Sequence, residues 1–327
     1  MLLPAVLLTV TLILSGCAAA EPKTQTAYVL DTICQVTVYD KNADEQILDD
    51  ALAICSEREQ LWSRTVETSD VGKLNAANGE WVTVSEDTAK LLSSALSVCE
   101  KSGGAFDITI AAASELWDFA SDDPAVPDAK ALAEAVRTVD YRNVEMNGLK
   151  VRLKNGAKLD LGGVAKGAIA DEMGAFLRDR GVKSALIDLG GNILAVGKKP
   201  DGTDFRIGLQ KPFAERGELM AVADAADCTL VTSGSYERHF EKDGEEYHHL
   251  LDSKTGYPAK SGLQSVTVIG EDSLTADALS TACFILGEDK ALVLLKDYPG
   301  VEAVFVREDG KIVETEGLEQ SGRITFK

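Results

Sequence analysis

Basic residues are in short supply in this 327-residue chain. Lys and Arg total 33 against 53 Asp and Glu, which gives a formal net charge of −20. Such an acidic surface argues against nucleic acid as a partner and against wide contact with anionic lipid. It also means that the overall field cannot attract an anionic ligand, so local dipoles, a metal ion or a few basic residues must hold one.

The cysteines form neither a zinc pattern nor a disulfide framework. One of the six, Cys17, follows an apolar leader, and the other five are odd in number and widely spaced. Zinc ligands usually come as close pairs, and disulfide frameworks as even sets. Most of the five lie in apolar stretches, and we expect buried small hydrophobes at Cys34, Cys55, Cys99, Cys228 and Cys283.

Long apolar runs are also missing after the N-terminus. Residues 1–16 are almost wholly apolar and uncharged, but an apolar core this short is typical of a signal peptide rather than a membrane span. The run Leu14-Ser15-Gly16-Cys17 resembles a bacterial lipobox, in which cleavage precedes a cysteine that then carries diacylglycerol. We therefore predict a signal peptide over 1–16, lipidation at Cys17, a tether over 17–26 and one domain over 27–327. The protein would be lipid-anchored at the extracytoplasmic face of the cell membrane.

The rest of the chain mixes strand and helix patterns without strict alternation. Alternation predicts a strand over 28–39, and helical spacing predicts a helix over 43–62. Residues 151–161 alternate around Asn155-Gly156, which predicts a hairpin. Helices are expected from Gly163 to Gly181 and over 273–286, with short strands at 185–189, 205–209, 228–232, 246–251 and 264–269. The predicted fold is α+β, with largely antiparallel sheets, packed helices and two intimately associated subdomains.

The segment from Asp160 to Gly167 (Asp-Leu-Gly-Gly-Val-Ala-Lys-Gly) is a candidate phosphate site. It places a carboxylate at a strand end, glycines at a helix start and Lys166 in the first turn. Free backbone N–H groups and the helix dipole favour phosphate there. The glycine spacing matches neither a dinucleotide fingerprint nor a P-loop. A tight strand-to-helix turn with no ligand explains the same residues.

Asp277 and Thr281 are candidate metal ligands. They are four residues apart, so on a helix their oxygens share one face. A carboxylate and a hydroxyl, completed by water and phosphate, suit Mg²⁺ better than a softer metal. A solvated Asp and a Thr bonded to its own helix would look the same in sequence.

Histidine is scarce, with only His239, His248 and His249 in the whole chain. Neutral histidine is a natural general base near pH 7. Adjacent residues of a strand point to opposite faces, so at most one ring of the His248–His249 pair faces a given site. A surface histidine would explain either one in isolation.

Together with weaker segments, these motifs resemble the ApbE family of FAD:protein FMN transferases along nearly all of the chain after the leader. Family members are commonly exported lipoproteins, in agreement with Cys17. The matching segments, in chain order, are Leu61–Ser63, Leu74-Asn75, Gly104–Thr109, Leu116-Trp117, Leu159–Gly167, Gly190–Asn192, Thr232–Tyr236, His249–Gly256 and Ala276–Thr281.

The resemblance implies a role for each matching residue. Mg²⁺, or Mn²⁺ in its place, would be held by Asp277, Thr281 and the backbone carbonyl of Gly163, and His249 would be the general base. The implied contacts of FAD, which is a substrate, are Leu30, Thr65, Ala105, Phe106, Asp107, Asp160, Lys166 and Leu251.

Two positions depart from the family pattern. Leu30-Asp31-Thr32 stands where members often have Met-Gly-Thr, and Asp252-Ser253 replaces the more usual Asp-Pro. Leucine can still pack against an adenine or flavin ring, whereas an aspartate in place of glycine changes the local backbone.

The activity implied is Mg²⁺-dependent transfer of the FMN half of FAD to a Ser or Thr hydroxyl, with release of AMP. The acceptor would be an exported subunit or domain of a redox-driven electron-transport complex. Water as the acceptor would instead make the protein an FAD pyrophosphatase that yields FMN and AMP. A flavin-binding lipoprotein without catalysis is the alternative from another class.

Overall fold

The computed structural model describes residues 21–327 except 42, 120 and 122. The predicted signal peptide and Cys17 lie outside the described residues. Within the described part, no helix is long and apolar enough to cross a membrane. The first strand already begins at Lys23 and pairs with the next from Lys23↔Val38, so residues 23–26 belong to the sheet rather than to the predicted tether.

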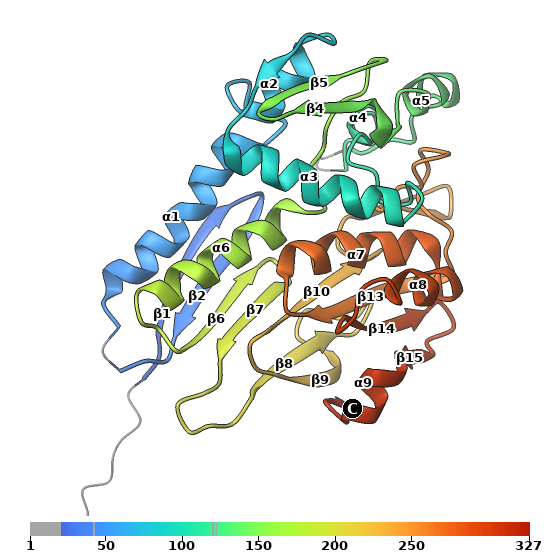
Figure 1. The fold of residues 1–327 in the computed structure, drawn as a ribbon. Helices are drawn as coiled ribbons and strands as arrows, with labels where there is room; N and C mark the ends of the chain where they lie inside the picture. The colour runs from blue at the N-terminus through green and yellow to red at the C-terminus, as the bar shows by residue number, and fades with distance from the viewer. Residues whose placement is uncertain (1–20, 42, 120, 122) are drawn as a thin grey trace, which may run out of the picture.

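The core of the molecule is an eight-stranded sheet in the order β1-β2-β6-β7-β10-β13-β14-β15 (Figure 1). Every neighbouring pair in it is antiparallel. The strands are β1 (Lys23–Val29), β2 (Thr32–Val38), β6 (Ser184–Leu189), β7 (Asn192–Gly197), β10 (Cys228–Gly234), β13 (Leu263–Gly270), β14 (Glu302–Arg307) and β15 (Ile312–Glu314).

The two faces of this sheet are covered differently. Helices α1 (Glu45–Trp62), α6 (Ala165–Asp179) and α7 (Ser273–Leu286) lie across one face (Figure 1). Strands β8 (Phe205–Gln210), β9 (Leu219–Ala225) and β16 (Ile324–Phe326) form a small sheet that covers part of the other. In β10, Val231 packs in the helix-side core and its neighbour Leu230 in the core beneath the small sheet. Central strands are therefore apolar on both faces.

A smaller group of elements stands at one end of the layered part (Figure 1). Its sheet has the order β3-β5-β4, and a third apolar cluster surrounds the buried Trp117. The elements of the chain not yet given bounds are α2 (Asp70–Ala76), β3 (Val82–Thr83), α3 (Glu86–Lys101), α4 (Ala111–Trp117), α5 (Ala129–Val136), a 3-10 turn (Tyr141–Asn143), β4 (Val144–Asn147), β5 (Lys150–Leu153), β11 (His239–Lys242), β12 (Glu245–His248), α8 (Glu288–Leu295) and α9 (Glu316–Ser321). Of these, α8 and α9 lie beside the main sheet rather than in the smaller group. The α+β class with largely antiparallel sheets is thus confirmed.

The predicted hairpin over 151–161 is wrong in its second arm. Asn155 and Gly156 do turn with positive φ of 54° and 74°, but β5 pairs with β3 and β4 instead. The second arm instead forms a parallel bridge between Lys158 and Ile110, with Asp160 N donating to Ile108 O at 2.8 Å. It also bonds the side chain of Asn75, whose Oδ1 accepts from Leu159 N at 2.7 Å and whose Nδ2 donates to Leu159 O at 2.9 Å.

The single strand predicted over 28–39 is a hairpin. Leu30 and Asp31 form its two-residue turn, with φ of 58° and 55°. Such turns favour Asn-Gly because both central residues need positive φ. Leu-Asp carries no such signal, and the alternating pattern continues across these two residues, so the sequence predicts one strand instead of two.

Candidate active site

The Asp160–Gly167 segment leads from the smaller group of elements into α6. Asp160 Oδ1 accepts from Gly162 N at 2.9 Å, and Oδ2 lies 3.2 Å from Arg64 Nε and 3.3 Å from Ser114 Oγ. The Lys166 Nζ folds back to Gly162 O at 3.3 Å. The glycine turn thus carries one fixed carboxylate and one ammonium group at the start of a helix.

Asp277 and Thr281 lie on α7, one helical turn apart as their spacing predicts, and the fold brings them to the start of α6. Asp277 is 3 % exposed, and its Oδ2 accepts from Gly167 N at 2.9 Å. A β-carbon built on Gly163 would lie 3.5 Å from Thr281 Oγ1 and 3.1 Å from the Phe106 ring. Gly163, Phe106 and Thr281 therefore meet where α6 begins.

The donors gathered there fit magnesium. Asp277 offers a carboxylate and Thr281 a hydroxyl, both from α7, and Gly163 just before α6 would offer its backbone carbonyl, so all three donors are oxygen. Within the described residues, Asp277 Oδ1 forms no hydrogen bond, and no group of three or more His, Cys, Asp and Glu side chains could hold a metal. A site with a single carboxylate suits Mg²⁺, which retains waters and binds substrate phosphates. It does not suit zinc.

The ring of His249 is held by a backbone carbonyl. Its Nδ1 lies 3.3 Å from Arg238 O, and its backbone N donates to the same oxygen at 3.1 Å. With Nδ1 as the donor, Nε2 is left with a free lone pair; this tautomer is assigned from the hydrogen bond. Burial lowers the pKa of His249 to about 3, with smaller contributions from the charges of Arg238 and Lys166. His249 is therefore neutral at pH 7.

His248, the last residue of β12, has different surroundings from His249, which lies in the bend after the strand. Its ring is buried and packs edge-on against Phe284, with 5.4 Å between ring centroids. Burial lowers its pKa to about 4. The third histidine, His239, is exposed and stacks edge-on with Phe213. The charge of Lys166 contributes to the lowered pKa of His249 but not to that of His248.

Phe106 and Asp107 of the Ala105–Asp107 stretch make different contacts. The ring of Phe106 reaches Gly163, beside the site. The carboxylate of Asp107 is instead engaged by its own surroundings: Oδ1 accepts from Thr109 N and Oγ1, and Oδ2 from Tyr141 N. Burial raises the pKa of Asp107 despite these bonds. The structure thus gives Asp107 a part in shaping the loop, and its contact with FAD stays a prediction.

Leu30, Thr65 and Leu251 lie in separate surroundings. Leu30 is half-buried in the β1–β2 turn, and its N donates to Glu59 Oε1 at 3.1 Å. Thr65 is exposed and bonds Ser63 Oγ at 2.8 Å. Leu251 is buried in the Trp117 cluster. Their implied contacts with FAD stay predictions as well.

Three further side chains touch the candidate residues. Arg64 and Ser114 hold Asp160, and Ser233 Oγ lies 3.2 Å from Thr281 Oγ1. Ser233 falls in one of the matching motifs, but Arg64 and Ser114 carry no sequence signal because only the fold brings them to Asp160.

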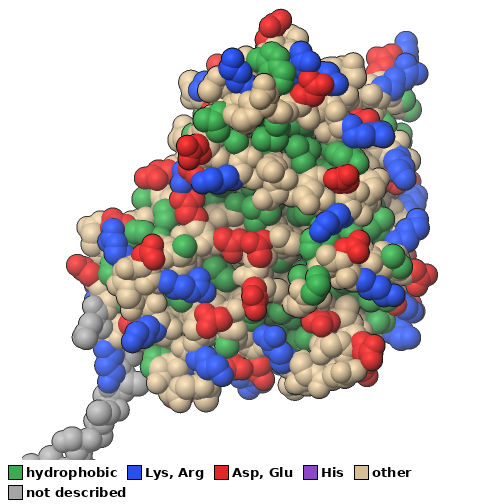
Figure 2. Space-filling model, in the orientation of Figure 1, with side chains coloured by type: hydrophobic (Ala, Val, Ile, Leu, Met, Phe, Trp, Pro, Cys, Tyr) green, Lys and Arg blue, Asp and Glu red, His purple; other side chains and the backbone are tan. Residues whose placement is uncertain are grey.

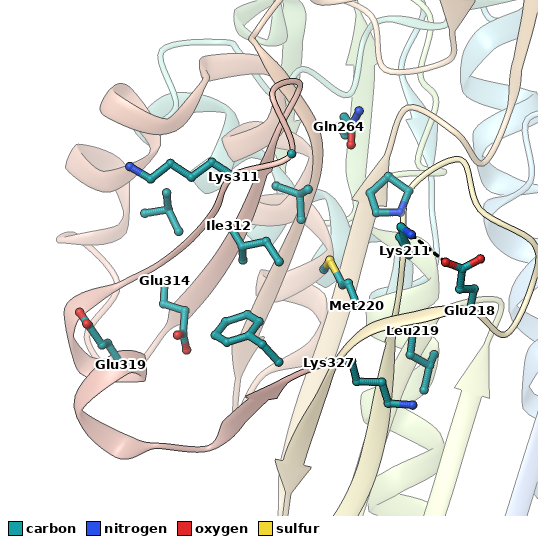
Figure 3. A pocket seen from close by; sticks show the side chains of 15 residues that line it. Lys211, Glu218, Leu219, Met220, Gln264, Lys311, Ile312, Glu314, Glu319 and Lys327 are labelled. Carbon is teal, nitrogen blue, oxygen red and sulfur yellow. Dashed lines mark hydrogen bonds and ion pairs between the residues drawn. The ribbon is translucent and has the colours of Figure 1, made fainter.

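Surface charge and cavities add little to this site. Acidic and basic side chains are interspersed over the face shown in Figure 2, without one dominant basic patch. A groove of about 900 Å³ lies between β9 and β15 and is drawn in Figure 3. Its lining, which includes Lys211, Met220 and Lys311, contains none of the predicted site residues.

Comparison with known proteins agrees with this geometry. The family described as the ApbE family matches residues 30–305, and the chain belongs to that family. It is 36 % identical to the FAD:protein FMN transferase of Treponema pallidum, over 94 % of this chain and 91 % of the relative. It is 34 % identical to one of Klebsiella pneumoniae, over 83 % and 85 %.

Solved structures give the same result. The ApbE protein of Thermotoga maritima superposes with a TM-score of 0.84 at 33 % identity, over 92 % of this chain and 99 % of that one. The flavinyl transferase ApbE of Pseudomonas stutzeri gives a TM-score of 0.81 at 28 % identity, over 92 % and 96 %. The predicted family and fold class are confirmed.

Proposed function

We propose that this protein transfers the FMN part of FAD to a Ser or Thr hydroxyl of an exported acceptor protein. The observation that carries the proposal is the meeting of Gly163, Asp277 and Thr281 at the start of α6, beside Lys166. The names of the relatives from Treponema pallidum and Klebsiella pneumoniae support the same activity.

The reaction is a displacement at phosphorus. The acceptor hydroxyl oxygen bonds to the FMN-side phosphorus, the bond from that phosphorus to the bridging oxygen breaks, and AMP leaves with that oxygen. Such reactions depend on positioning and charge neutralisation rather than on covalent chemistry by the protein. Lys166 and the helix start supply positive charge locally on a protein of net charge −20.

Asp277, Thr281 and the carbonyl of Gly163 would hold Mg²⁺, or Mn²⁺ in its place. The ion would supply charge neutralisation at the pyrophosphate oxygens. His249 Nε2 would take the proton of the acceptor hydroxyl. Its low pKa keeps the ring neutral and ready to accept, and the negative charges of a bound pyrophosphate favour the protonated ring, so the pKa rises when FAD binds.

The location follows from the sequence signals of the leader. A lipid at Cys17 would hold the domain at the extracytoplasmic face of the cell membrane. Acceptors would then be exported subunits or domains of redox-driven electron-transport complexes. The acidic surface makes nucleic acid an unsuitable partner.

The test incubates the chain without residues 1–17 with FAD, Mg²⁺ and an exported flavin-carrier domain, and measures AMP release and the mass of the acceptor. We expect a mass gain of one FMN residue that is lost with EDTA and in Asp277→Asn. Asp272→Asn is the matched control, because it lies on the same helix end and asparagine caps as well as aspartate. AMP without acceptor gain would indicate FAD hydrolysis, and flavin binding without either product would indicate a binding protein.

A further inference from the structure

Helices α6 and α7 exchange carboxylates at their N-terminal ends. Asp277 of α7 accepts from Gly167 N in the first turn of α6 at 2.9 Å. Asp171 of α6 accepts from Ser273 N with Oδ1 and from Leu274 N with Oδ2, both at 2.9 Å, in the first turn of α7. Each helix thus satisfies first-turn N–H groups of the other, which have no partner within their own helix.

The exchange is symmetric along the two helices. Asp171 follows Gly167 by four residues, and Asp277 follows Ser273 by four residues. The helices also touch here, because a β-carbon on Gly167 would lie 2.2 Å from Ser273 O. Ser273 is fixed to the sheet as well, since its Oγ bonds Thr229 Oγ1 and Asn192 Oδ1, both at 2.9 Å. Three carboxylate hydrogen bonds at one close crossing, one from Asp277 and two from Asp171, fix both the separation and the rotation of the helices.

This crossing determines the geometry of the candidate metal site. Gly163 and Lys166 lie at the start of α6, whereas Asp277 and Thr281 lie on α7. The site oxygens therefore sit on two separate helices, and their distances depend on how those helices are held together. Of the two carboxylates at the crossing, Asp277 is a proposed ligand, and Asp171 bonds only the backbone of α7.

We propose that Asp171 is a positioning residue for the divalent-cation site: it holds the start of α7 against α6 so that Asp277 and Thr281 meet the carbonyl of Gly163. The inference rests on the proposed function, because it takes Asp277 as a ligand. Residues that hold metal ligands in place without touching the metal themselves are important for binding, and their loss commonly lowers metal affinity by roughly 10- to 100-fold.

The test measures Mn²⁺ binding to the purified protein by electron paramagnetic resonance, with and without FAD, together with the melting temperature. Burial raises the pKa of Asp171 to about 6, so the titrations are run at pH 8, where the carboxylate is ionised. The variants are Asp171→Ala, Asp171→Asn, which keeps one acceptor oxygen, and Asp277→Ala. The matched control is Asp272→Ala, which removes a cap bond to Thr275 N within α7 itself.

We expect the Mn²⁺ dissociation constant to rise about ten-fold in Asp171→Ala, less in Asp171→Asn, and to stay near wild type in Asp272→Ala at a comparable loss of melting temperature. Equal affinity in Asp171→Ala and wild type would overturn the positioning role alone, as would equal losses in Asp171→Ala and Asp272→Ala. If wild type binds no Mn²⁺, or Asp277→Ala still binds it, the metal assignment fails and the positioning role with it.

Discussion

Gly167 of α6 lies against the carbonyl of Ser273 at the start of α7, so closely that an added β-carbon would fall 2.2 Å from that oxygen. Backbone atoms cannot yield as a flexible side chain can. We expect Gly167→Ala to force the helices apart and to destabilise the fold by about 1–3 kcal/mol or more, although alanine is the better helix former. The melting temperature and the affinity for Mn²⁺ should both fall.

Gly174 is the matched control on the same helix. A β-carbon there would meet Leu194 Cδ2 at 2.7 Å, the far end of a flexible side chain. We expect Gly174→Ala to cost little, because the Leu194 side chain can shift and the helix gains up to about 1 kcal/mol from alanine. Equal melting temperatures for the two variants would contradict the close crossing of α6 and α7.

Trp117 and Gly256 are joined by a buried hydrogen bond from the indole Nε1 to the carbonyl oxygen, 2.8 Å long, across 139 residues of sequence. Trp117→Phe keeps an aromatic ring but leaves that carbonyl without its donor. We expect a loss of about 1–3 kcal/mol from the free energy of unfolding. Trp81→Phe, at an exposed ring, should change stability by less than about 0.5 kcal/mol. Similar urea midpoints for both variants would argue against the bond.

The elements that the sequence predicts well are those with local signals. Helix 273–286 is found as predicted, because Asp272 caps it and its apolar residues recur at helical spacing. The hairpin turn at Leu30-Asp31 could not be predicted, because its positive φ values are imposed by the surrounding sheet rather than favoured by its residues.

The candidate site divides in the same way. Asp277 and Thr281 could be paired from spacing alone, because four residues make one turn of a helix. The position of Gly163 against Thr281 depends on how α6 packs against α7. These helices are far apart in sequence: Gly167 and Asp277, which bond each other, are separated by 110 residues. Spacing says nothing about such a crossing, and for that reason the resemblance, rather than the pattern, supplied the third ligand.

The five cysteines of the described domain are all buried and free. We expect the folded protein without residues 1–17 to react with a thiol reagent only very slowly, because thiols are reactive when exposed and ionised. Burial raises the pKa of Cys99 and of Cys283 to about 12, which lowers their thiolate fraction further. In denaturant without reductant, all five should react. A count of three would instead reveal a disulfide.

Two histidines with lowered pKa values, the buried His248 and the partly buried His249, should make the protein sensitive to mild acid. Burial lowers the pKa of His248 to about 4 and that of His249 to about 3, whereas a histidine in the unfolded chain has a pKa of about 6.5. Between these values the unfolded chain binds more protons than the folded one, so the stabilising contribution is present above about pH 6.5 and is lost as the pH falls towards 4. We therefore expect the melting temperature to drop from pH 7.5 to pH 5.

His248→Gln removes one of these titrations and should reduce that drop. The matched control is Phe284→Leu, which removes the ring packed against His248 and lowers stability without removing a titrating group. It should lower the melting temperature at both pH values and keep the full difference between them. If His248→Gln shows the same drop as wild type, protonation of His248 is not coupled to unfolding, and its ring would have to be accessible to water in the folded protein.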